Sequence, residues 1–190
     1  MKLNVILIIA ASMVAATCQD KTSDTSLTSP DGEINVSFSL SQEGIPHYLV
    51  SAYGQAVINS SELGLEAEQA DLRPGFTITK VRHEAKDEQW EQPWGENKVM
   101  RDNHREMAVE MSNGQGVKLT LRFKAFDDGV GYRYEYDATA VTDSLTIIGD
   151  HTYFNFAQDG MSWSIGSYFS GYELPYREQA ISATQNPNTP

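Results

Sequence analysis

Two tryptophans stand among acidic residues in the stretch DEQWEQPWGENKVMRDNHREM, residues 87–107 of this 190-residue chain. An indole face can pack on the apolar C–H face of a sugar ring, while carboxylates accept hydrogen bonds from the sugar hydroxyls. Trp94 and Glu96 are therefore candidate sugar-binding residues. The alternative is that Trp90 and Trp94 simply fill the edge of the fold. Pro93 within this stretch predicts an irregular loop rather than the interior of a strand.

A second stretch, MSWSIGSYFSGYELPYREQ (residues 161–179), surrounds one acid, Glu173, with aromatic rings. A carboxyl group in such surroundings can have a raised pKa or can bind a metal ion. It can equally be a solvated residue between core tyrosines, and composition alone favours that alternative.

The acidic pair Asp127-Asp128 lies in FKAFDDGVGYRYEY, between two segments with strand character. Short polar residues followed by Gly129 are typical of a hairpin turn, and Asp128-Gly129 is suited to positive φ. A calcium loop needs more oxygen ligands at tight alternating spacing, which this stretch lacks. We therefore interpret the two aspartates as turn residues.

Other kinds of active site find no support in the sequence. The four histidines are scattered and none has the helical spacing of a zinc motif, so neither a nucleophilic triad nor a zinc site can be assembled. No glycine-rich phosphate loop opens a helix. These histidines are His47, His83, His104 and His151.

Apolar residues alternate with polar ones along most of the chain, which is the period of half-buried antiparallel strands. Asn113-Gly114 and Asp128-Gly129 predict hairpins, so residues 106–136 should form a three-stranded meander. No stretch after the N-terminus has a helical period. The sequence thus predicts a mostly β fold, an antiparallel β-sandwich. The alternating sets are Ile34, Val36, Phe38 and Leu40; Phe76 and Ile78; Met107, Val109 and Met111; Val117, Leu119, Leu121 and Phe123; Tyr132, Tyr134 and Tyr136.

The N-terminus has the features of an export signal. Lys2 precedes the apolar run LNVILIIAASMVAA, which is short for a membrane span. Cleavage after Ala16 would give a secreted protein, whereas lipidation of the single cysteine, Cys18, would give a bacterial lipoprotein. We expect residues 1–18 to be the signal peptide, 19–29 a polar spacer and 30–190 the domain, exported to the periplasm or cell surface of a Gram-negative bacterium. The net charge of −12 argues against nucleic acid and anionic membranes as partners.

The order of four motifs resembles the N-terminal domain of glycoside hydrolase family 97. These are SPDGEINVSFSL, WEQPWGE, RFKAFDDGVGYRYEY and YELPY, and the resemblance runs from Ser29 to the end of the chain. It implies a β-supersandwich of the galactose mutarotase type that lacks its last strands. It also implies a (β/α)8 barrel as partner, α-glucosides or α-galactosides as substrates, and calcium at the active site.

The resemblance assigns roles to few residues of this chain. Glu173 in YELPY matches a family glutamate that helps bind calcium, and Trp94 and Glu96 match a loop near the same interface. The catalytic carboxylates of the family belong to the barrel, so the chain alone is expected to be inactive. Three functions remain open: the N-terminal domain of an α-glycosidase, a cell-surface module that binds an α-linked oligosaccharide, or a non-catalytic remnant.

Overall fold

The computed structural model describes residues 24–136, 145–166 and 174–184. The predicted signal peptide with Cys18, and Glu173, lie outside these ranges. No helix in the described part is long and apolar enough to cross a bilayer. The end of the predicted spacer is not a linker, because Ser26–Thr28 form a strand and Leu27 is buried. The folded domain therefore begins before residue 30.

The first sheet has the strand order β1-β2-β3-β4, and every neighbouring pair is antiparallel. It contains β1 (Ser26–Thr28), β2 (Ile34–Leu40), β3 (Pro46–Ala52) and β4 (Gln55–Glu62). In β2, Ile34, Val36 and Phe38 are buried while the residues between them are not, as the alternation predicts.

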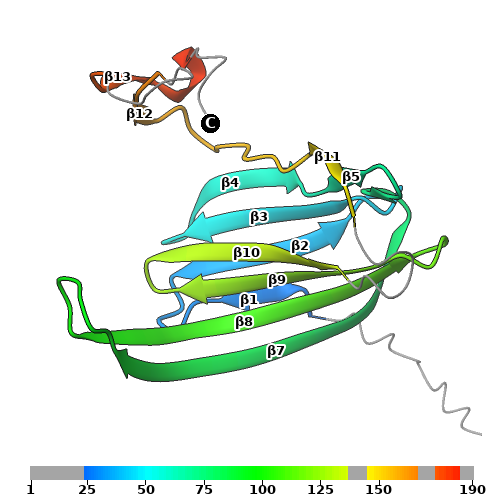
Figure 1. Ribbon diagram of the computed structural model, residues 1–190, viewed down its shortest axis with the longest axis horizontal. Helices are drawn as coiled ribbons and strands as arrows, with labels where there is room; N and C mark the ends of the chain where they lie inside the picture. The colour runs from blue at the N-terminus through cyan, green and yellow to red at the C-terminus, as the bar shows by residue number, and fades with distance from the viewer. Residues whose placement is uncertain (1–23, 137–144, 167–173, 185–190) are drawn as a thin grey trace, which may run out of the picture.

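The second sheet has the order β10-β9-β8-β7 and packs face to face with the first (Figure 1). It contains β7 (Phe76–Glu91), β8 (Val99–Asn113), β9 (Lys118–Phe126) and β10 (Gly129–Tyr136). The predicted meander of residues 106–136 is confirmed as the end of β8 with β9 and β10. The fold is thus a mostly β antiparallel sandwich, as predicted.

Two smaller sheets complete the described structure. One has the order β11-β5-β6 and the other pairs β12 with β13. Their elements are β5 (Leu65–Ala67), β6 (Asp71–Leu72), β11 (Ile147–Asp150), β12 (Met161–Ser164) and β13 (Arg177–Ala180), followed by the 3-10 turn η2 (Ile181–Ala183).

The outer edge of β4 is covered by residues 151–157, which run antiparallel to it. The Asn59 amide donates to the Asn155 carbonyl at 2.8 Å, and the Ala157 amide donates to the Val57 carbonyl at 3.0 Å. Asn155 also donates its side-chain amide to the Ser60 carbonyl at 2.9 Å. The first sheet is therefore extended by an irregular fifth segment.

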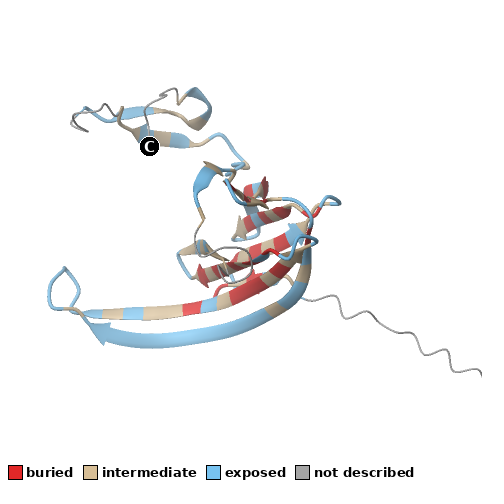
Figure 2. Ribbon diagram, turned by 45° about the vertical axis from the view of Figure 1, so that its right-hand side comes forward, coloured by how far each residue is buried: buried red, intermediate tan, exposed pale blue. Residues whose placement is uncertain are grey.

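The buried residues lie between the two sheets, as the red segments in Figure 2 show. The core is centred on Phe123, which is fully buried. Its ring lies 6.1 Å from that of Phe38 and 5.9 Å from that of Tyr132, centroid to centroid. Such tilted aromatic contacts add to the free energy of burial. Every inward-facing position of β9 is buried, so this strand is the middle of the core.

The hairpin turns carry their polar residues for structural reasons. Asp127 accepts a hydrogen bond from the Asp31 amide at 2.9 Å, which ties the β9–β10 turn to the β1–β2 connection. This supports the turn interpretation of Asp127. The expected positive φ at Asp128-Gly129 is wrong, since neither residue has one. In the β8–β9 turn, the left-handed residue is Gly116 with φ of 82°.

Strands β7 and β8 continue past the end of their pairing with β9 as a two-stranded ribbon, which we call the arm (residues 86–104; Figure 1). Along β7 every residue from 82 to 91 is exposed, as the pale-blue strand in Figure 2 shows. A lone hairpin is marginally stable in water, so the arm depends on its root in the sandwich.

The central position of Phe123 leads to a prediction about stability. Phe123→Ala should lower the free energy of unfolding by about 3–5 kcal/mol, because it removes a fully buried ring and leaves a cavity. Chemical denaturation followed by far-UV circular dichroism measures the loss. Leu49→Ala is the control, since Leu49 is 41% exposed and should cost little. Equal losses in the two variants would contradict this account of the core.

Candidate functional site

The tip of the arm carries Trp94, which was predicted to contact sugar, and Trp90 lies in the adjoining end of β7. Trp94 is 82% exposed and Trp90 is 50% exposed, so neither fills the edge of the sandwich, and that alternative is wrong. The predicted irregular loop is also wrong for most of its length. Only residues 92–98 form a loop, because β7 extends to Glu91 and pairs Trp90 with Met100.

The tip loop has a defined conformation despite its exposure. The Gln92 side-chain amide donates to the Asn97 carbonyl at 2.7 Å, and the Gln92 backbone amide donates to the Lys98 carbonyl at 3.0 Å. Gly95 has φ of 121°, and a Cβ at this position would lie 2.6 Å from the Gln92 amide nitrogen. The loop therefore requires glycine beside Trp94 and presents Trp94 and Glu96 to solvent.

Ion pairs across the ribbon hold the arm in register. Both carboxylate oxygens of Asp87 accept from the Arg101 guanidinium at 2.7 Å. This bidentate pair lowers the pKa of the Asp87 carboxyl. Lys98 pairs with Glu91 at 3.4 Å nearer the tip. In the described part of the chain, no third strand pairs with the arm. These ion pairs and the backbone hydrogen bonds between its two strands therefore position the tip.

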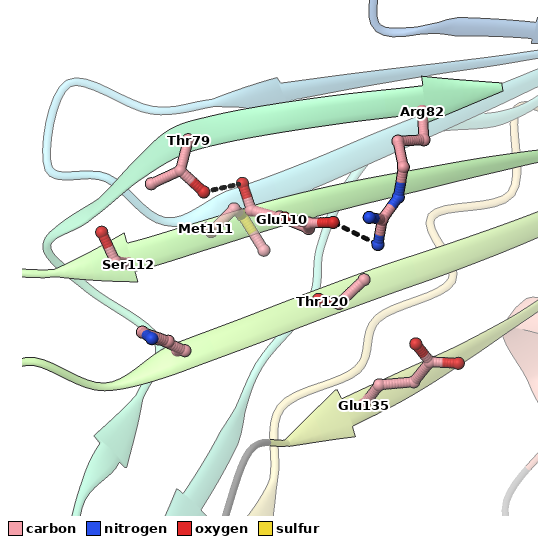
Figure 3. A pocket seen from close by; sticks show the side chains of 8 residues that line it. Thr79, Arg82, Glu110, Met111, Ser112, Thr120 and Glu135 are labelled. Carbon is pink, nitrogen blue, oxygen red and sulfur yellow. Dashed lines mark hydrogen bonds and ion pairs between the residues drawn. The ribbon is translucent and has the colours of Figure 1, made fainter. Parts of the chain in front are cut away.

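A second candidate site is a polar cavity of about 480 Å³ on the outer face of the second sheet (Figure 3). Glu110, Thr120 and Glu135 lie in one row across three adjacent strands. Arg82 pairs with Glu110 from β7, and the Thr79 hydroxyl donates to the Glu110 carbonyl at 3.0 Å. The cavity thus places two carboxylates on either side of a hydroxyl.

One of those carboxylates, Glu135, is surrounded by guanidinium groups. The Arg122 guanidinium donates to Glu135 at 2.6 and 2.9 Å, and a third nitrogen donates to Glu106. With Arg133 also donating, these bonds hold the pKa of the Glu135 carboxyl at about 2, well below its usual value of 4.5. Glycoside hydrolysis needs one protonated and one ionised carboxyl group. Glu135 therefore fits only the ionised role, and Glu110 is engaged in an ion pair with Arg82, so we interpret both carboxylates as members of a structural ion-pair network.

A buried histidine lies at the root of the arm. His104 is 2% exposed, its Nδ1 is hydrogen-bonded to Asp102, and its ring centroid lies 5.1 Å from that of Phe126. A histidine oriented by a carboxylate is one half of a catalytic triad. The small cavity beside it is lined by charged residues and an alanine, with no hydroxyl or thiol. We therefore interpret the pair as packing that anchors the arm.

The structure tests the predicted metal site only in part, because Glu173 lies outside the described residues. In the ranges that are described, no group of three or more His, Cys, Asp or Glu side chains is placed to hold a metal ion. The described residues therefore do not by themselves fit a calcium site, for which six to eight oxygen ligands are typical.

Comparison with known proteins now identifies the family. The model of the glycosyl-hydrolase 97 N-terminal domain matches residues 27–190. The chain belongs to this family. The match includes both sheets of the sandwich, the arm and the segment that contains Glu173.

Solved structures of family 97 enzymes agree with this assignment. One, from Pseudoalteromonas sp. strain K8 in complex with panose, is 36% identical with a TM-score of 0.75 and is matched over 80% of this chain. The same enzyme with acarbose is matched over 81% at the same identity and TM-score. A beta-arabinopyranosidase structure shares the fold with a TM-score of 0.75 at 21% identity.

The family 97 chain described here spans only a fraction of its relatives. It covers 24% of the Pseudoalteromonas enzyme. A probable retaining alpha-galactosidase of Streptomyces bingchenggensis is 26% identical over 119 residues, which are 63% of this chain and 18% of that protein. The comparison therefore concerns the N-terminal part of these enzymes.

The outer-face cavity and its ion-pair network were not predicted from the sequence. Glu106, Arg122 and Glu135 are far apart in the chain and meet only through the registers of β8, β9 and β10. The two predicted hairpins fix which residues of neighbouring strands lie opposite each other, and this register would have placed the charged residues side by side. The outward-facing residues of these alternating strands carried the signal, whereas the prediction had used only the inward-facing, buried residues.

The low pKa of Glu135 predicts how stability depends on pH. A carboxyl group whose pKa is lower in the folded state than in the unfolded state stabilises the protein at pH values above the unfolded-state pKa. This contribution is lost as the pH falls from about 4.5 toward 2. Glu135→Gln should cost about 1–2 kcal/mol at pH 7 and less at pH 3. Urea unfolding at both pH values measures this difference. Glu33→Gln is the control, because Glu33 lies in an exposed turn. A loss of unfolding free energy in Glu135→Gln that is as large at pH 3 as at pH 7 would contradict the assignment.

Proposed function

We propose that this chain is the N-terminal domain of a family 97 α-glycosidase acting on α-glucosides or α-galactosides. The observation that carries the proposal is the family match over residues 27–190. The panose and acarbose complexes of the Pseudoalteromonas enzyme and the name of the Streptomyces relative support this substrate class. The domain would support a catalytic (β/α)8 barrel, which would supply the reacting carboxylates.

We further propose that the domain completes the active site from outside the barrel. Glu173 would provide one oxygen ligand to a calcium ion, with the remaining ligands coming from the barrel. A single carboxylate binds calcium weakly, so this site would require both domains. When bound, calcium would supply positive charge near the reacting bond.

The arm is suited to contact a sugar at the edge of such a pocket. Trp94 presents its ring to solvent, next to Glu96, on a tip fixed by Gln92. Placing an indole and a carboxylate on one loop gives an apolar platform with a hydrogen-bond acceptor beside it, which suits a pyranose ring.

A chimera tests the domain proposal and the role of Glu173. Residues 27–190 would replace the matching region of the Pseudoalteromonas enzyme, and release of p-nitrophenol from p-nitrophenyl α-glucoside would be measured against calcium concentration. We expect an active chimera, and Glu173→Gln should raise the calcium concentration for half-maximal activity about tenfold or more.

The control for this experiment is Glu178→Gln, because Glu178 is exposed and follows Glu173 closely in the sequence. The isolated 190-residue chain should be inactive under the same conditions. Equal calcium dependence of the Glu173 and Glu178 variants would remove Glu173 from the site. Turnover by the isolated chain would contradict the assignment of the reacting groups to the barrel.

The exposure of Trp94 also favours a second candidate function, a stand-alone module that binds an α-glucan. Affinity electrophoresis in gels with soluble α-glucan should then retard the isolated chain, and Trp94→Ala should abolish most of the retardation, since stacking dominates such contacts. Trp163→Ala is the matched control, because Trp163 is an exposed tryptophan outside the arm. Unretarded mobility on every glycan tried would remove this candidate.

A further inference from the structure

The outer-face cavity of the second sheet is lined by side chains of balanced charge. Arg82 and Lys118 are positive, whereas Glu110 and Glu135 are negative. The lining is therefore neutral in sum, although the whole chain carries a net charge of −12. Such a site favours neither anions nor cations, because a charged ligand would lie beside a side chain of its own sign.

Short hydroxyl side chains form the middle of this cavity. Thr120 of β9 lies between Glu110 of β8 and Glu135 of β10, and Ser112 of β8 lies opposite Lys118 of β9 (Figure 3). Serine and threonine are shorter than the charged residues around them, so the sheet face is hollow at this point. Its volume of about 480 Å³ lies within the range of small-molecule sites.

Three polar side chains of the cavity have no bonding partner among the described residues. They are those of Ser112, Lys118 and Thr120. The Thr77 hydroxyl donates to the Ser112 carbonyl at 3.2 Å, which leaves the Ser112 hydroxyl unused. Lys118 is exposed, and neither hydroxyl is among the buried polar atoms without a partner. All three groups are therefore accessible to a ligand.

The carboxylates of the cavity keep acceptor capacity while they hold guanidinium groups. Glu135 Oε2 accepts one hydrogen bond from Arg122 at 2.9 Å. A carboxylate oxygen has two lone pairs, so this oxygen can also accept a hydrogen bond from a hydroxyl group. The ion-pair network and a bound ligand are thus compatible.

A neutral ligand with several hydroxyl groups matches this set. An ammonium group donates to hydroxyl oxygens, carboxylates accept from hydroxyl protons, and the serine and threonine hydroxyls do both. The lining contains no aromatic ring that could pack on the apolar face of a sugar. The cavity is therefore suited to the hydroxyl edge of a pyranose rather than to its face.

We propose that the outer-face cavity binds one neutral pyranose unit of an α-linked oligosaccharide through its hydroxyl groups. Lys118 and Thr120 would bond neighbouring hydroxyls, and Glu135 would accept from one of them. The choice of α-linked sugars rests on the proposed function, whereas the preference for a neutral sugar rests on the lining.

This site would be separate from the sugar contact proposed for the tip of the arm. Glu110 lies about 35 Å along β8 from Val99, where the tip loop ends, at the rise of an extended strand. A short oligosaccharide does not span that length. The two contacts would therefore act together only on a long glucan, which they would hold at two points.

Titration of the 190-residue protein with methyl α-glucoside and methyl α-galactoside tests the proposal. Amide signals followed by nuclear magnetic resonance report where the sugar binds and how tightly. We expect saturable shifts at residues 110–120 of β8 and β9 with at least one of the two sugars. Glucuronate and glucosamine, which carry a negative and a positive charge, should bind severalfold more weakly.

Variants of the cavity distinguish this site from unspecific binding. Thr120→Val and Lys118→Gln should each weaken binding about threefold to tenfold, the loss expected for one hydrogen bond. Thr28→Val is the matched control for the first, because Thr28 lies on β1 of the other sheet. Lys98→Gln is the matched control for the second, because Lys98 lies on the arm with its side chain 77% exposed.

Several results would overturn the proposal. These are the absence of saturable shifts with both neutral sugars, tighter binding of a charged sugar, and equal affinities of the cavity variants and their controls. Shifts at residues 110–120 that disappear in Trp94→Ala would assign the binding to the arm instead. Failure of the proposed function would appear as an inactive chimera, so the two failures are distinguishable.

Discussion

The structure depends on one constraint: every inward residue of β9 must be buried between two sheets that come from distant parts of the chain. Phe123 contacts rings from β2, β3 and β10, so the packing of one side chain fixes how four strands lie. The turns then serve this packing. Asp127, which bonds the Asp31 amide, joins the ends of the two sheets at one corner.

The outer face of the second sheet obeys a different rule. Its charged side chains do not bury apolar surface, but they pair across strands, with Arg122 between Glu106 and Glu135. Such a network holds the strands in register, and Arg122 lowers the pKa of the Glu135 carboxyl.

The sequence predicted the parts of the fold that depend on local pattern. Alternation identified the strands of residues 34–40 and 117–123, and the turn residues located the hairpins. The arm was misjudged because Pro93 and Gly95 indicate a loop, and nothing local reveals that the strands resume on both sides of it. The register bulge between Ile78 and Lys80, which shifts the alternation of β7, was likewise invisible. Glu173 was singled out by its aromatic neighbours and assigned to calcium through the resemblance, and its role remains a prediction.

The ribbon construction of the arm restricts how its reach can change. Adding or removing one residue in each strand would turn Trp90 and its partner Met100 to the opposite face, since side chains alternate along a strand. Only steps of two residues per strand preserve their orientation, and each step moves the tip by about 6.6 Å. The distance from the sandwich to the tip can therefore change during evolution only in discrete steps, if the tip is to keep its orientation.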